Sequence, residues 1–181
     1  AGLLAVSILS TTDERLAKAL QEYRESLKEK VADLDVANVL GDLLGYSFLD
    51  LFAGSGILGL EAASRGASPV VCVEKDRKKF PVLLQNAAMA KPAVFCKAMP
   101  AETFIMRNKQ AFDIIFLDPP FDYRFKLQLL ERLDRSSSIH DGSLVLIHFP
   151  REDNLPQEIS GLRCYDMRIF GRSIVHFYRK I

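Results

Sequence analysis

The sequence lacks long apolar runs, has few cysteines and carries almost no net charge, and each shortage excludes a class of protein. No stretch approaches the ~20 apolar residues that cross a bilayer, so we expect no membrane insertion. The three cysteines are an odd number, widely spaced and set in apolar runs, which argues against a disulfide framework and favours buried structural thiols. A net charge of +1 gives no general attraction to nucleic acid, although basic clusters occur at 75–79 and 163–180.

Histidine is equally scarce. His140, His148 and His176 lie far apart and have no metal-ligand spacing, so we expect structural or surface roles for them and no metal site. The apolar start of the chain has no basic residue before it, which argues against a signal peptide and favours a cytoplasmic protein.

What the sequence does contain is a regular alternation of strand and helix patterns. The capping-box spacing of Thr11 and Glu14 predicts a helix to Leu34, and Asp35 predicts a second one to Leu44. We expect strands at 46–51, 69–74, 93–96, 112–117, 144–149, 162–170 and 174–178, and helices at 57–65, 77–89, 100–108 and 127–133. We therefore expect an N-terminal helical segment, 1–45, that packs on a larger domain, 46–181.

The order of these elements predicts the fold class. The early strands and helices form βαβ units, which favour a parallel sheet. Gly171-Arg172-Ser173 joins the last two strands and predicts an antiparallel hairpin. We predict an α/β, Rossmann-like fold with a seven-stranded, mostly parallel sheet, a C-terminal antiparallel hairpin and helices on both faces. This arrangement resembles the class I S-adenosylmethionine-dependent methyltransferases.

Residues 49–59 place an apolar strand, an acidic residue and three glycines in succession. Turn glycines let a ligand approach the backbone, and the following helix starts with unpaired N–H groups. The run from Gly54 to Gly59 matches G-x-G-x-x-G, with Glu74 20 residues after Gly54, so a dinucleotide fits as well as an adenosyl ligand. Asp50, Glu74 and Asp118 all close predicted strands, where open parallel sheets bind ligands.

The loop Asp118-Pro119-Pro120-Phe121 distinguishes between these ligands. Its prolines have no N–H, so the loop presents mainly acceptors. Asp118 and the Pro119 carbonyl would accept both hydrogens of an exocyclic amine on a base and localise its lone pair, while Phe121 stacks on the ring. A plain proline turn is the alternative, but the glycine turn and Glu74 favour the catalytic interpretation.

Together, residues 49–65, Val73-Glu74-Lys75-Asp76, Asn86 and the Asp118 loop resemble the RsmD-type methyltransferases, which methylate guanine N2 in small-subunit ribosomal RNA. The resemblance implies S-adenosylmethionine as cofactor and ribosomal RNA or a small-subunit particle as partner; we expect no metal and a monomer. It implies catalytic roles for Asp118, Pro119, Pro120 and Phe121. The residues implied to bind the cofactor are Asp50, Phe52, Ala53, Gly54, Ser55, Gly56, Glu74, Lys75, Ala98, Met99 and Asp118.

Other functions stay open on the sequence alone. The same chemistry could act on adenine N6 of DNA or on a protein amide. The fold could instead keep its cofactor and serve as a ribosome-assembly module, because ten largely apolar residues precede Thr11 where the family usually has a basic hairpin. A dehydrogenase would explain the glycine turn but not the Asp118 loop.

Overall fold

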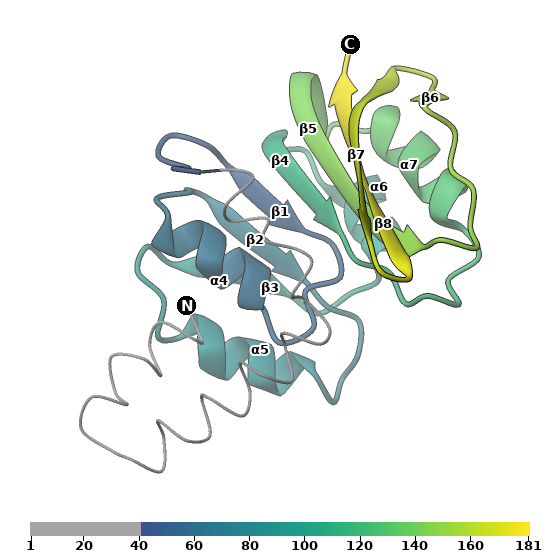
Figure 1. Ribbon diagram of the computed structural model, residues 1–181. Coiled ribbons are helices and arrows are strands. Elements are labelled where there is room, and N and C mark those ends of the chain that lie inside the picture. Colours follow the sequence, from purple (N-terminus) through teal and green to yellow (C-terminus); the bar gives the residue numbers. More distant parts are fainter. Residues whose placement is uncertain (1–40) are drawn as a thin grey trace.

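The computed structural model describes residues 41–181, which form one mixed sheet with helices on both faces (Figure 1). The strands are β1 (Phe48–Asp50), β2 (Val70–Val73), β3 (Val94–Lys97), β4 (Phe112–Leu117), β5 (Ile139–Pro150), β6 (Glu158–Ile159), β7 (Leu162–Phe170) and β8 (Ser173–Lys180). The helices are α4 (Ile57–Ser64), α5 (Phe80–Ala87), α6 (Ala101–Arg107) and α7 (Lys126–Asp134).

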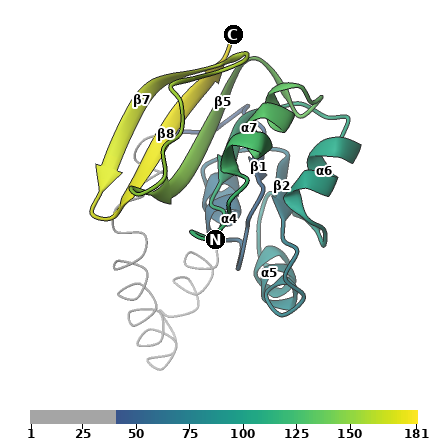
Figure 2. The ribbon, with the colours of Figure 1, turned by 90° about the vertical axis from the view of Figure 1, so that its right-hand side faces the viewer.

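The strand order is β3-β2-β1-β4-β5-β8-β7-β6. The chain moves outward from β1 to β3 and then returns to place β4 on the other side of β1, so the order reverses between β1 and β4. Strands β1 to β5 are parallel, β8 runs antiparallel beside β5, and β7 runs antiparallel beside β8 (Figure 2). In open sheets of this kind, the crevice at the reversal is where ligands bind.

Two apolar clusters cover the sheet. One holds buried side chains of α6 and α7, and the other holds those of α4 and α5. Strand β2 is buried at all four positions, Val70-Val71-Cys72-Val73, as expected for a parallel strand covered on both faces. Within residues 41–181, no helix has the length and apolar character that crossing a bilayer requires.

The fold class is confirmed, with differences in detail. The sheet has an eighth strand, β6, whose two residues are too few to show an alternating pattern. Strand β5 starts at Ile139 and not at residue 144, because Ile139 already pairs with Phe112 on β4; the register then shifts, and the pairing resumes at Leu144 opposite Ile114.

The N-terminal predictions fall mostly outside the described residues. Of the helix expected from Asp35 to Leu44, residues 41–44 are described and are not helical, and Gly45 adopts φ +84 in a turn before β1. The cysteine prediction was partly wrong. All three thiols are free, but Cys72 alone is buried; Cys96 and Cys164 are partly exposed.

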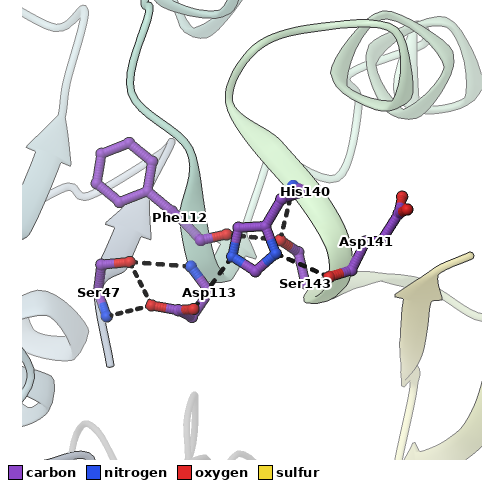
Figure 3. A network of polar contacts seen from close by, with 6 residues as sticks. All are labelled: Ser47, Phe112, Asp113, His140, Asp141 and Ser143. Carbon is purple, nitrogen blue, oxygen red and sulfur yellow. Dashed lines mark hydrogen bonds and ion pairs between the residues drawn. The ribbon is translucent and has the colours of Figure 1, made fainter. Parts of the chain in front are cut away.

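At the amino ends of β1, β4 and β5, a polar network joins the three strands (Figure 3). Oδ2 of Asp113 accepts hydrogen bonds from the Ser47 N–H at 2.8 Å and hydroxyl at 2.6 Å, and Nε2 of His140 lies 3.1 Å from Oδ1. The Ser143 hydroxyl donates to the Phe112 carbonyl and accepts from the His140 N–H. Because the imidazole contacts no hydroxyl here, the network is a structural connection and not a catalytic triad.

Candidate active site

The carboxyl ends of β1, β2 and β4 bring three predicted carboxylates together. Asp50 pairs in register with Cys72 on one side and Phe116 on the other, and Glu74 and Asp118 each lie two residues beyond these partners. All three carboxylates line one cavity of about 880 Å³. This volume is in the range of small-molecule and cofactor sites.

Most of the predicted site residues line this cavity. They are Asp50, Phe52, Ala53, Gly54, Ser55, Glu74, Lys75, Asp118, Pro119, Pro120 and Phe121. Gly56, Ala98 and Met99 are not among its lining residues. The Met99 side chain packs against the apolar cluster under α6 and α7. Cofactor contacts by Gly56, Ala98 and Met99 stay predictions.

The glycine turn is shaped by contacts within the protein. Gly54 adopts φ +55, and a Cβ there would have no atom within 4 Å. Gly56, at φ +86, lies against α5, because a Cβ would come within 2.4 Å of Leu83 Cδ1. A Cβ on Gly59 would come within 2.2 Å of the Cys72 sulfur, so this glycine lets α4 pack closely on β2.

Glu74 occupies backbone donors that a pyrophosphate would need. Its Oε2 accepts from the Gly54 N–H at 2.7 Å, and its Oε1 accepts from the Asp76 N–H at 2.7 Å. The N–H of Gly56 donates to the Ala53 carbonyl at 2.7 Å. Each carboxylate oxygen of Glu74 retains a lone pair for a hydroxyl group. The turn therefore fits a ribose better than a diphosphate.

Asp50 is a buried carboxyl group that lines the cavity, and its protonation depends on what the cavity holds. Its side chain is buried, and this desolvation raises the pKa of Asp50 to about 8, against a hydrogen bond from the Phe52 N–H at 3.2 Å. The negative charges of Asp118 and Glu74 add to the rise. A cation bound among these carboxylates would favour the ionised form of Asp50.

The Asp118 loop is held from two sides. Nδ1 of His148, on the neighbouring strand β5, lies 2.8 Å from Asp118 Oδ1. The buried Nζ of Lys126 donates to the carbonyls of Phe121 at 2.9 Å and Tyr123 at 2.6 Å, and pairs with Asp153 Oδ2 at 2.8 Å. Phe121 is left half exposed at the cavity.

Tyr123 anchors the far end of this loop. Its hydroxyl hydrogen-bonds Glu102 on α6, and its ring meets Phe52 edge to face at 5.8 Å between centroids. Burial, with the neighbouring Glu102 carboxylate, raises the pKa of Tyr123. Sequence reasoning found neither His148 nor Lys126. The role of His148 depends on the pairing of β5 with β4, and that of Lys126 on its ion pair with Asp153, a loop residue far along the chain.

The residues that the structure describes contain no group of three or more histidine, cysteine, aspartate or glutamate side chains arranged to hold a metal ion.

The model of the family described as Conserved hypothetical protein 95, the RsmD family, matches residues 9–179 of the chain. The chain belongs to this family. Ribosomal RNA small subunit methyltransferase D of Escherichia coli K12 is a relative with 29% identity over 136 residues, which are 73% of this chain and 67% of that protein. The RsmD-type assignment made on the sequence motifs is therefore confirmed.

Two solved structures agree with this chain in fold. A conserved hypothetical protein from Streptococcus pyogenes is 34% identical, with a TM-score of 0.75 over 81% of this chain and 93% of that one. SMU.776, a methyltransferase structure complexed with SAH, gives a TM-score of 0.65 over 84% of this chain and 49% of that one. Its 13% identity makes this a likeness of fold alone. The chain has the class I methyltransferase fold.

Proposed function

We propose that this RsmD-type protein transfers a methyl group from S-adenosylmethionine to the exocyclic N2 of a guanine in small-subunit ribosomal RNA. The observation that carries the proposal is the Asp118 loop. Oδ2 of Asp118 has no hydrogen-bond partner among residues 41–181, and Asp118 lines the same cavity as the half-exposed ring of Phe121.

The cavity fits the proposed cofactor. S-adenosylmethionine carries an ammonium and a sulfonium, and the cavity offers the buried Asp50 and the carboxylates of Glu74 and Asp118. Glu74 has acceptor capacity for the ribose hydroxyls, and Gly54 leaves the backbone uncovered beside them. Asp50 and Gly54 would hold the methionine part, and Glu74 the ribose.

When bound, S-adenosylmethionine supplies an electrophilic methyl group whose bonding electrons stay on sulfur as the carbon–sulfur bond breaks. Residues of this chain orient and activate the nucleophile, which is the exocyclic amine of the base. Asp118 and the Pro119 carbonyl accept the two N–H bonds of the amine, which localises its lone pair, and Phe121 stacks on the base. The amine loses one proton after attack, and Asp118 is half exposed, so that proton can pass through it to water.

The surroundings of the cavity suit a nucleic acid. Lys75, Lys78 and Lys79 are exposed and line its entrance from the β2–α5 loop. Across the same edge of the sheet, the Arg151 N–H donates to the Arg172 carbonyl at 3.0 Å, which fixes two further arginines at the ends of β5 and β7. Phosphates on either side of an unstacked base would meet positive charge.

A labelled-methyl transfer assay on undermethylated small subunits, followed by mapping of the modified base, tests the proposal. We expect Asp118→Ala to lower the transfer rate by about 100-fold or more, because an acceptor that acts in the transition state is lost. Cofactor affinity, measured by calorimetry, should change little. Full activity of Asp118→Ala would refute the role of this loop.

The position of the label tests the alternatives. If the label were found on adenine N6 or on a protein amide, that group would be the substrate in place of guanine N2. Cofactor binding without transfer to any of these would instead support a ribosome-assembly module.

A further inference from the structure

His148 lies directly beside the catalytic loop. In the parallel pairing of β4 and β5, Leu117 is opposite Ile147, so the next residues, Asp118 and His148, are neighbours. Nδ1 of His148 is 2.8 Å from Asp118 Oδ1, and its side chain is only 8% exposed. The imidazole also lines the cavity. Apolar packing alone does not explain a buried polar side chain at this position.

The two ring nitrogens have different surroundings. Nδ1 faces a carboxylate, whose oxygens accept hydrogen bonds. Nε2 is buried and has no partner among the residues that the structure describes. A proton on Nε2 would therefore be an unsatisfied buried donor, whereas a proton on Nδ1 bonds Asp118. The geometry selects the tautomer that carries its proton on Nδ1.

The same ring touches the aromatic part of the site. Phe121 and His148 meet edge to face, with 5.5 Å between ring centroids and 74° between planes. One imidazole thus contacts both the carboxylate and the phenyl ring that the proposed function assigns to the target base. Within residues 41–181, His148 is the only hydrogen-bond partner of the Asp118 side chain.

We propose that His148 is a positioning residue for methyl transfer, an inference that rests on the proposed function. Its Nδ1–H engages Oδ1 of Asp118 and so turns Oδ2 toward the amine, while its edge-to-face contact with Phe121 sets the orientation of that ring. Asp118 is half exposed and would otherwise rotate freely in water. Holding an acceptor in one orientation before the substrate arrives lowers the cost of reaching the transition state.

Three substitutions separate positioning from packing. The amide nitrogen of asparagine can take the place of Nδ1, leucine has a similar size but no donor, and glutamine places its amide one bond too far. We expect His148→Leu and His148→Gln to lower kcat on RNA by about 10- to 100-fold, with KM for RNA and cofactor affinity within about 3-fold. His148→Asn should recover most of the lost kcat. Thermal melting of each variant controls for folding.

A second readout needs no substrate. In protein labelled with ¹⁵N-histidine, we expect NMR to show His148 protonated on Nδ1, with a slowly exchanging proton that Asp118→Ala removes. Protonation on Nε2 would overturn the inference, as would equal kcat for wild type and a folded His148→Leu. If the wild-type protein methylated no RNA, the proposed function would fail first, and the positioning role with it.

Discussion

At the scale of single residues, Asp50 is a side chain of the cavity whose ionisation lowers the free energy of unfolding. The carboxyl is buried beside two other acidic groups, and its pKa is raised from 3.8 to about 8. In the unfolded chain it loses its proton near pH 4, but in the folded chain it keeps the proton to about pH 8. Unfolding therefore releases a proton between these values, and Asp50 lowers the free energy of unfolding as the pH rises.

We expect Asp50→Asn to stabilise the protein without cofactor. The amide is neutral at every pH and can still accept from the Phe52 N–H, so the gain at pH 8 should be on the order of 1 to 3 kcal/mol. The gain should shrink toward pH 4. Urea unfolding at several pH values measures it, and Asp122→Asn, on an exposed loop residue, is the matched control.

The same substitution should weaken cofactor binding, because the neutral amide no longer attracts a cation. Calorimetry at pH 8 would show a higher Kd for Asp50→Asn than for wild type. If Asp50→Asn were more stable than wild type and bound the cofactor with unchanged affinity, the charge of Asp50 would not contribute to cofactor binding.

At the scale of elements, the three glycines of the turn serve different purposes. Gly54 borders the cavity, Gly56 accommodates α5, and Gly59 lets α4 approach β2. A match to G-x-G-x-x-G thus reports a strand, a turn and a closely packed helix. Glu74 occupies the N–H of Gly54, so that the turn has one backbone donor fewer for a pyrophosphate.

The close contact of α4 with β2 predicts the effect of Gly59→Ala. The new methyl group would lie 2.2 Å from the Cys72 sulfur, so we expect a loss of about 1 to 3 kcal/mol in the free energy of unfolding. Removing the sulfur should relieve the clash. The double variant Gly59→Ala/Cys72→Ala should therefore lose less than the sum of the two single variants, and additive losses would contradict the contact.

The sequence predicted those features that local patterns encode. Branched apolar runs located seven strands, and strand ends located Asp50, Glu74 and Asp118. Features that depend on pairing were missed. The two-residue β6 exists only because β7 lies beside it, and His148 matters only because β5 places it next to β4.

At the scale of the whole molecule, the two edges of the parallel sheet differ. The amino edge is closed by the hydrogen bonds of Ser47, Asp113 and Ser143 (Figure 3). The carboxyl edge holds the cavity, with buried acidic groups inside and exposed lysines around it. A chain with a net charge of +1 thus keeps acidic and basic side chains apart within one site, where the proposed cationic cofactor and the proposed RNA would each meet the opposite charge.

The exposed lysines at the carboxyl edge of the sheet predict how salt affects RNA binding. We expect Lys78→Gln/Lys79→Gln to weaken binding and to reduce the slope of log K against log salt by up to about 0.7 per lost phosphate contact. Lys109→Gln, just before the amino end of β4, is the control and should leave the slope unchanged. Filter binding from low to moderate salt measures both. Equal slopes for all variants would place the RNA elsewhere.

The strand order also has a consequence for synthesis of the chain. Strand β8 lies between β5 and β7 although it is made after both. Until residues 173–180 leave the ribosome, the long strand β5 has an unpaired edge that carries Val145, Ile147 and Phe149. A nascent chain that has reached β7 but not β8 therefore exposes an unpaired, apolar strand, which is prone to aggregate and is a target for chaperones.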